Sequence, residues 1–421
     1  MAARRPTRKP WTVLAYTVAD DRSGGSALDA AAQRELAALC DAADFGQVSV
    51  AAQVDFKRLP GVFRGALTAR PARARAFAPT KAEEHPLWRR ILGRVEHSTL
   101  RVETERTDLN AARANVLRGF LRYGQEACPA DRYLVFFYGH AFGPMGLFFD
   151  ASTRQRHPNT LRLNDLATSL EAVEGRAAVI VFRDCFMNTL ETAFQLAGEG
   201  EFMIASQSVV PIAGVWPWLG VMATLMPGAS SADIARAVAL QLGQFLDADE
   251  NRGRFADVPY SLIDLEATRH VVPVLGALVE ALDSARHEPA RRVACAKALE
   301  KARGGCPDDP SRPGDPALVD VPTMCERLAA LEGDPVAGPA RALGEVVGER
   351  IVRWHHSTGR RHRGISLYYQ PVTPRDRERS YILAPTEEDL ARDAAYYGKL
   401  DLSHATGWHR LALQPLDPGS A

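Results

Sequence analysis

The sequence is poor in cysteine and has no long apolar run. Six cysteines are spread unevenly over 421 residues without a C-x-x-C pair, a pattern that predicts neither a disulfide framework nor a zinc site. No apolar run reaches the roughly 18 residues that a transmembrane helix needs. Polar residues interrupt the segment after the basic N-terminus, which argues against a signal peptide. We therefore expect a protein of the reducing cytoplasm whose cysteines are free thiols.

Net charge is also absent, because 51 basic residues balance 51 acidic ones. The chain as a whole has no electrostatic attraction to nucleic acid or to membranes, so neither is expected as a partner. Arginines concentrate in residues 57–107, but the most basic part of that stretch has no interleaved aromatic residues. We interpret it as a solvated insertion, with an anion-binding or partner-binding segment as the alternative.

A strand followed by a helix is predicted around Cys185. Residues 178–182 form an apolar, largely β-branched run, typical of a strand buried on both faces of a parallel sheet. Asn188 and Thr189 are candidate N-caps of the following helix. Cys185 should therefore lie at the carboxyl edge of the sheet, where open α/β folds keep their chemistry, and a helix N-terminus there would favour a thiolate. Taken alone, such a cysteine is more often a small buried apolar residue.

His140 follows a second strand of the same design. Residues 133–138 are apolar, and the glycines and proline after His140 indicate a loop. If the two strands are neighbours in a parallel sheet, their ends lie about 5 Å apart. His140 and Cys185 could then form a base–nucleophile pair. The alternative for the histidine alone is a loop side chain with local hydrogen bonds.

Several segments in a fixed order carry a family resemblance. They are residues 11–21, 51–56, 127–143, 184–196, 202–218, 363–371 and 402–412. With these segments the chain resembles the clostripain family of cysteine proteases, which are caspase-fold enzymes. The resemblance implies an α/β fold, a caspase-like α/β/α sandwich with a mostly parallel central sheet, plus a C-terminal helical subdomain.

The expected domain organisation follows from this resemblance and from the helical patterns. Residues 1–10 are interpreted as a flexible basic arm, residues 11–225 as the catalytic core, and residues 226–421 as a mainly helical subdomain that returns a strand to the core. That strand is predicted at 364–370. Helical patterns cover residues 26–42, 110–127, 231–246, 265–285, 291–302 and 336–353.

The resemblance implies a cysteine endopeptidase that needs no cofactor. Cys185 would be the nucleophile that forms a thioester acyl-enzyme, and His140 the acid–base partner, without a third residue. The backbone N–H groups of Ala141 and Cys185 would hold the oxyanion. The family usually has glycine where this chain has Ala141, and alanine has less freedom at positive φ.

Specificity departs from the family pattern, in which an aspartate two residues before the nucleophile selects basic side chains. Here that position is Arg183, and side-chain alternation directs it to the pocket and Asp184 away from it. Either the pocket accepts acidic or neutral residues, which we favour, or Arg183 turns out and Asp184 or Asp150 restores basic specificity. Ser206 and Gln207 are expected to line the same pocket by resemblance.

Activation is expected in the polar loop between the two catalytic residues. Family members are commonly cut there, and Arg154 and Arg156 are the candidate processing sites. The protein would then be a zymogen, with an upstream protease as a further partner; an uncut surface loop is the alternative.

A weak calcium site is the remaining candidate for a cofactor. The acidic cluster at Asp247 and Asp249 could supply oxygen ligands, as in some family members. It lacks the spaced glycine of an EF-hand loop, so we favour a solvated acidic turn. Calcium is accordingly not expected to be required.

Three functions fit these observations. The first is a cytoplasmic cysteine endopeptidase that cleaves protein or peptide substrates in a regulatory or defence-like step. The second is a catalytically weak caspase-fold binding module, suggested by Ala141 and Arg183 but opposed by the presence of both Cys185 and His140. The third is another thiol acyl-transferase, such as a peptide ligase, which sequence cannot separate from a hydrolase.

Overall fold

The computed structural model divides into two compact units. The first contains Met1–His140, Leu147–Arg183 and Pro211–Phe255, and the second contains Ala141–Gly146, Asp184–Val210 and Ala256–Ala421. The described residues are 7–20, 27–43, 48–57, 62–67, 110–148, 160–212, 214–253, 255, 258–303, 314–357, 362–384 and 386–417.

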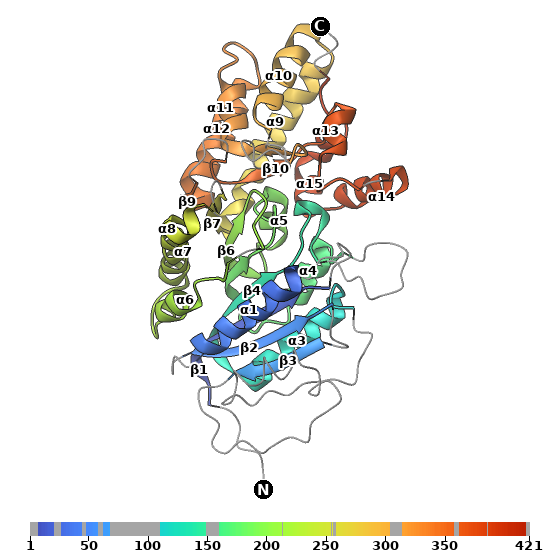
Figure 1. Ribbon diagram of the computed structural model, residues 1–421. Helices are drawn as coiled ribbons and strands as arrows, with labels where there is room; N and C mark the ends of the chain where they lie inside the picture. The colour runs from blue at the N-terminus through green and yellow to red at the C-terminus, as the bar shows by residue number, and fades with distance from the viewer. Residues whose placement is uncertain are drawn as a thin grey trace. The chain divides into compact units, whose positions relative to one another are not determined.

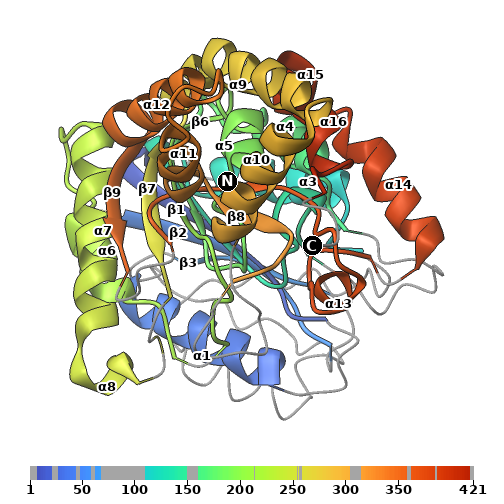
Figure 2. The same cartoon turned by 90° about the horizontal axis from the view of Figure 1, so that it is seen from above.

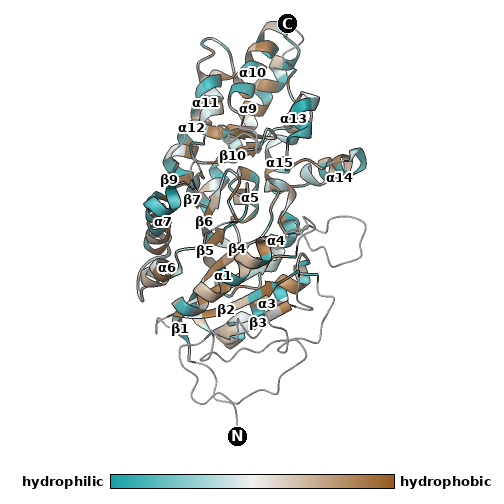
Figure 3. Ribbon diagram, viewed as in Figure 1, coloured by the Kyte–Doolittle hydropathy of each residue, from teal (hydrophilic) through white to brown (hydrophobic). Residues whose placement is uncertain are grey.

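The first unit contains a mostly parallel sheet (Figure 1). Its strands, in spatial order, are β3 (Val62–Leu67), β2 (Val48–Asp55), β1 (Lys9–Val18), β4 (Ala130–Tyr138) and β5 (Ala177–Phe182). Neighbours from β2 to β5 are parallel, and β3 pairs antiparallel with β2. β2 and β5 are buried along their whole length, and brown, hydrophobic ribbon prevails in the strands of this sheet that Figure 3 shows. Continuous apolar runs of this kind suit a parallel sheet covered on both faces.

The helices of the first unit form two contacting groups. α3 packs on β1, β2, β3 and α4, whereas α6 contacts both α1 and α7. Their bounds are α1 (Ala27–Ala42), α3 (Ala114–Ala127), α4 (Leu163–Leu170), α6 (Trp218–Thr224), α7 (Ser231–Asp247) and α8 (Asp249–Arg252). α3 approaches the sheet so closely at Gly124 that a Cβ there would lie 2.6 Å from Leu14 Cδ2 and 3.2 Å from Ala51 Cβ.

The second unit contains short antiparallel ladders and most of the helices. β6 (Gly200–Ser206) and β9 (Val352–His356) each pair with β7 (Tyr260–Asp264), and β8 (Leu318–Asp320) pairs with β10 (Ser366–Tyr368). The first group of helical elements is η1 (Gly143–Met145), α5 (Leu190–Gln195), η2 (Glu266–His270), α9 (Val271–Arg286) and α10 (Pro289–Lys301). The others are α11 (Val321–Ala329), α12 (Ala337–Val346), η3 (Val347–Ile351), α13 (Pro374–Glu378), α14 (Glu387–Tyr397), α15 (Asp401–Thr406) and α16 (His409–Ala412). α9 to α12 pack on one another (Figure 2).

The α/β class with a mostly parallel sheet is confirmed, and the predicted strands and most predicted helices are present. The division into units differs from the predicted boundary at residue 225, because the chain passes repeatedly between the units. α7 belongs to the first unit, for example, whereas Asp184–Val210 belongs to the second. No helix within the described ranges is both long and apolar enough to span a bilayer.

Three local expectations need correction. The N-terminal arm is shorter than predicted, because β1 begins at Lys9 and Arg8 pairs with Asp131. The Arg-rich insertion contains β3, and its residues 68–107 lie outside the described residues. The predicted helix over 336–353 stops at Ile351 and continues as β9, which pairs with β7, while the predicted returning strand is β10, which pairs with β8.

The close packing of α3 predicts opposite effects of the same substitution at two glycines of this helix. Gly124→Ala should lower the free energy of unfolding by about 1–3 kcal/mol, because its methyl group overlaps Leu14. Gly119→Ala is the matched control: its Cβ would meet only Arg64 Nη2 at 4.0 Å, so it should raise stability by about 0.5–1 kcal/mol through helix propensity. Denaturant unfolding of both variants measures the difference, and equal effects would contradict the packing described.

Candidate active site

The carboxyl ends of β4 and β5 lie side by side in the first unit. The strands are parallel and in register, with Phe137 opposite Phe182. Beyond the ladder, the Arg183 N–H donates to the Phe137 carbonyl at 2.9 Å. His140 is half-buried two residues after β4, and its own carbonyl accepts from the Phe148 N–H at 2.7 Å. The predicted strand pairing is therefore confirmed, and the segments that lead to His140 and Cys185 start from one edge of the sheet.

Cys185 belongs to the second unit and is half-buried. The Val210 N–H donates to its Sγ at 3.3 Å. The pKa of the Cys185 thiol is raised to about 11, chiefly by burial and to a smaller extent by the neighbouring Asp184 carboxylate, against the lowering effect of the Val210 hydrogen bond. The expectation that a helix N-terminus favours the thiolate is wrong here. The helix begins only at Leu190, and its cap is Thr189, which accepts from the Thr192 N–H.

The turn after Cys185 is tight and left-handed. Phe186 is buried with φ of 59°, and its N–H donates to the Ser208 carbonyl at 3.1 Å. Gly143, in the loop after His140, has φ of 55°, and a Cβ there would lie 3.3 Å from the Phe186 carbonyl oxygen. Both the positive φ of Gly143 and the nearby Phe186 carbonyl oxygen favour glycine at this position. Within the second unit, the loop that follows His140 and the turn that follows Cys185 thus touch at Gly143 and Phe186.

The family usually has glycine at the position of Ala141, but the backbone of Ala141 does not have the positive φ that would strain an alanine. The described non-glycine residues with positive φ are Phe148, Arg176 and Phe186. Ala141 is not among them, and the left-handed turn of its loop falls on Gly143 instead. The Ala141 N–H is therefore compatible with the donor role predicted from the sequence.

Arg183 is an internal residue of the first unit. The residue is 2% exposed, and its side chain forms an ion pair with Glu35, which is 3% exposed. Its Nη2 donates to the Gly214 carbonyl at 2.9 Å, and its guanidinium carbon lies 4.5 Å from the centroid of the Tyr138 ring. The predicted role of Arg183 as a charge that faces substrate is thereby corrected: this charge is already neutralised inside the protein.

Glu35 is the residue that sequence reasoning missed. It also accepts from the Trp216 N–H at 3.2 Å and from Trp218 Nε1 at 2.6 Å, so it joins α1 to the 214–218 segment. Its only signal in the sequence is a carboxylate within the apolar pattern of residues 27–42. Such a carboxylate needs an internal partner, because a buried charge without one is costly.

Ser206 and Gln207 do not line an open pocket. Both are fully buried in the second unit. The Ser206 hydroxyl donates to the Ser208 carbonyl, and Gln207 Nε2 donates to Ser366 Oγ at 2.9 Å and to Asp320 Oδ2 at 3.1 Å. These side chains hold the end of β6 rather than face solvent. Asp184 is also completely buried, so its carboxylate is not presented at the surface.

The remaining predicted residues do not form a site in the described structure. Asp150, Arg154 and Arg156 lie outside the described residues. Asp249 is exposed and pairs with Arg252, whose Nη2 donates to the backbone carbonyl of Asp247. Within the described ranges no group of three or more histidine, cysteine, aspartate or glutamate side chains could hold a metal ion.

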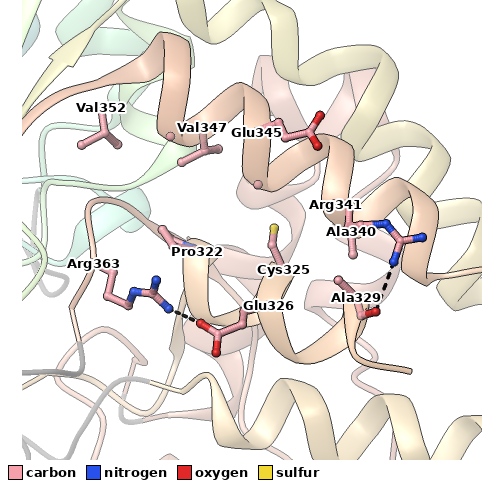
Figure 4. Close-up of a pocket in the computed structure, with 12 residues that line it drawn as sticks. Pro322, Cys325, Glu326, Ala329, Ala340, Arg341, Glu345, Val347, Val352 and Arg363 are labelled. Atoms are coloured by element: carbon pink, nitrogen blue, oxygen red, sulfur yellow. Dashed lines mark hydrogen bonds and ion pairs between the residues drawn. The ribbon is translucent and has the colours of Figure 1, made fainter. Parts of the chain in front are cut away.

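Two surface cavities lie away from the predicted catalytic residues. One, of about 510 Å³, lies between α11 and α12, with Cys325, Arg341 and the Arg363–Glu326 pair among its lining residues (Figure 4). The other, of about 490 Å³, is lined by α1, α7 and the 215–220 segment. Neither contains His140 or Cys185 in its lining.

Comparisons with known proteins agree with this reading of the fold. The family model of the clostripain family (Peptidase_C11) matches residues 87–302, just over half of the chain. An inactive zymogen C11 protease from Parabacteroides distasonis superposes with a TM-score of 0.62 at 17% identity, covering 95% of this chain and 99% of that one. A secreted C11 cysteine protease from Bacteroides thetaiotaomicron, in complex with an irreversible peptide inhibitor, gives 0.61 at 15% identity with the same coverage. No curated protein matches the chain.

The Arg183–Glu35 pair predicts a strongly non-additive effect on stability. Glu35→Gln keeps one oxygen acceptor within reach of both tryptophan N–H groups but leaves the charge of the buried guanidinium uncompensated, which should cost about 3–5 kcal/mol. Arg183→Met alone should also destabilise, because it leaves the Glu35 charge buried. The double variant should be more stable than the sum of the single effects predicts, by about 2 kcal/mol or more, when all four proteins are unfolded in urea. Additive effects would show that the pair is not coupled.

Proposed function

The chain belongs to the clostripain family and is therefore a cysteine protease, and we propose that it cleaves protein substrates through a dyad of Cys185 and His140. The observation that carries the assignment is the in-register pairing of β4 with β5, from whose adjacent ends both segments start. A thiol and an imidazole can serve as the nucleophile and the general base of acyl transfer from a peptide.

The proposed chemistry needs His140 as a base. With a pKa of about 11, the Cys185 thiol is ionised in only about one molecule in 10⁴ at pH 7. His140 would accept the Sγ proton as the sulfur attacks the scissile carbonyl carbon, and would return it to the leaving amine as the C–N bond breaks. Water would then hydrolyse the thioester with the same base. The N–H groups of Ala141 and Cys185 would hold the oxyanion.

These groups supply the reaction without a resident metal or cofactor, and we propose none. The alternative of a binding module loses its main supports, because Ala141 is outside the positive-φ region and Arg183 is neutralised by Glu35. A peptide ligase would use the same thioester with an amine in place of water, so product analysis must separate the two reactions.

Zymogen activation and cellular location remain proposals. We propose that cleavage in the loop between His140 and Cys185, by this protein or by an upstream protease, activates the enzyme in a regulatory or defence-like step. Four described cysteines are free thiols, which supports function in a reducing compartment such as the cytoplasm. The Bacteroides thetaiotaomicron protein is described as secreted, so the location needs a direct fractionation measurement.

The dyad predicts a pH signature in thiol reactivity. In His140→Ala, alkylation of Cys185 by iodoacetamide should rise about tenfold per pH unit from pH 7 towards about 11, because only the thiolate reacts and its pKa is raised. In the wild type, His140 should make the reaction faster at neutral pH and flatten this dependence.

The same proteins test proteolysis itself. Mass spectrometry of the purified chain should detect cleavage in the wild type and none in Cys185→Ala or His140→Ala. Cys325→Ala is the matched control, because that thiol is buried and lies in the second unit outside the candidate site. Identical pH profiles for wild type and His140→Ala, together with undiminished cleavage by Cys185→Ala, would refute the dyad.

Substrate preference should not depend on the charge of Arg183. The double variant Glu35→Gln/Arg183→Met removes both buried charges together, so its preference before the scissile bond should equal that of the wild type in a peptide library. Arg183→Asp is a poor probe, because it would place a second carboxylate beside Glu35. A changed preference in the double variant would show that Arg183 contributes to the pocket.

A further inference from the structure

A buried carboxylate fixes the segment 380–382 in the second unit. Asp315 is fully buried, and its two oxygens accept from four donors. Oδ1 accepts from the Ser380 hydroxyl at 2.7 Å and from the Ala317 N–H at 2.8 Å. Oδ2 accepts from the Tyr381 N–H at 2.7 Å and from the Ile382 N–H at 3.3 Å. Three of these four donors belong to the segment 380–382, so Asp315 is its anchor.

This segment touches the point where the two catalytic loops meet. Ile382 is buried, and its Cδ1 would lie 3.4 Å from a Cβ on Gly143. The same Cβ would lie 3.3 Å from the Phe186 carbonyl oxygen and 3.6 Å from Phe186 Cβ. Ile382 therefore packs at the contact between Gly143, two residues after Ala141, and Phe186, which follows Cys185. All of these residues belong to the second unit.

We propose that Asp315 is a positioning residue for the catalytic turn: by fixing Ile382, it holds Gly143 against Phe186 and thereby sets the N–H and Sγ of Cys185. This inference rests on the proposed function of Cys185. A left-handed conformation at a phenylalanine is strained and persists only where its surroundings enforce it. The Ile382 side chain helps to enforce this conformation, because its contact with Gly143 prevents the Gly143 loop from moving away from Phe186.

The charge of Asp315 decides how well it can hold the segment. As a carboxylate it accepts all four donors, whereas a protonated oxygen would direct a hydrogen at N–H groups that offer no acceptor. Burial raises the pKa of Asp315 to about 6, against the lowering effect of its hydrogen bonds. The segment should therefore be held firmly above about pH 6 and loosened below it.

The other ionisable groups around Asp315 do not account for a change in protonation near pH 6. Tyr368 on β10 is buried, and its pKa is raised, so it stays a neutral phenol. Asp393, Glu191 and Arg377 act on the same Tyr368, the first two raising its pKa and the last lowering it. The described donors to Asp315 itself are backbone N–H groups and one hydroxyl, none of which titrates here.

Asp315→Asn tests the proposal, because it keeps the shape but behaves like the protonated acid at every pH. At pH 7.5 we expect kcat to fall about tenfold with KM within about twofold, as a misplaced catalytic group costs rate rather than binding. The ratio of wild-type to variant kcat should approach one as the pH falls from 7.5 to 5. A residue that only stabilises the fold would give a ratio independent of pH.

Two further variants separate positioning from stability. Ser380→Ala removes one of the four donors and should give a smaller loss of kcat, with the acidic fall-off in activity retained. Asp334→Asn is the matched control: this carboxylate in the second unit accepts from Arg291 and from the Val336 N–H, in the helical part of the unit. It should lower stability without changing the pH dependence of kcat.

Hydrogen exchange decides the proposal independently of catalysis. Asp315→Asn should speed amide exchange at least about tenfold in peptides that cover 141–146 and 185–190, and Asp334→Asn should not. If the wild type cleaves nothing and Cys185 is unreactive, the proposed function fails, but faster exchange would still establish the coupling. Unchanged exchange and an unchanged kcat in Asp315→Asn would overturn the inference.

Discussion

The parallel, in-register pairing of β4 with β5 is the constraint on which the candidate site depends. Both strands are largely apolar and almost entirely buried, so the hydrophobic effect favours their place inside the protein. Parallel neighbours end at the same edge, and there the backbone of Arg183 bonds to Phe137. His140 and Cys185 then follow within three residues of the strand ends, where loops rather than ladder hydrogen bonds decide their conformation.

Buried polar groups then stabilise the segments that follow this edge. In the first unit, the Arg183–Glu35 pair ties the end of β5 to α1 and to the tryptophans at 216 and 218. In the second unit, Gln207 joins the end of β6 to Ser366 and Asp320. In each case a charge or amide inside the protein is satisfied by several partners, which makes its burial tolerable and its geometry specific.

The sequence was most informative where a local pattern had a single physical solution. The apolar runs at 133–138 and 178–182 could hardly be anything but buried strands, and Thr189 caps the next helix as expected. Prediction failed where a side chain had two plausible partners. Strand alternation predicted that Arg183 faces the pocket, yet its guanidinium pairs with a carboxylate 148 positions earlier in the chain, which no local pattern reveals.

The sequence by itself determined the α/β class, the order of the strands that precede His140 and Cys185, and the family, because these depend on short apolar runs and motifs. Only the tertiary structure decided which polar residues are internal. Ser206 and Gln207 have the composition of a pocket wall and are buried, whereas Asp315 gave no signal and anchors a segment more than sixty residues away. The physical reason is that a polar side chain is about as stable in water as in the protein interior when all of its hydrogen bonds are formed there. That set is assembled only when distant parts of the chain come together.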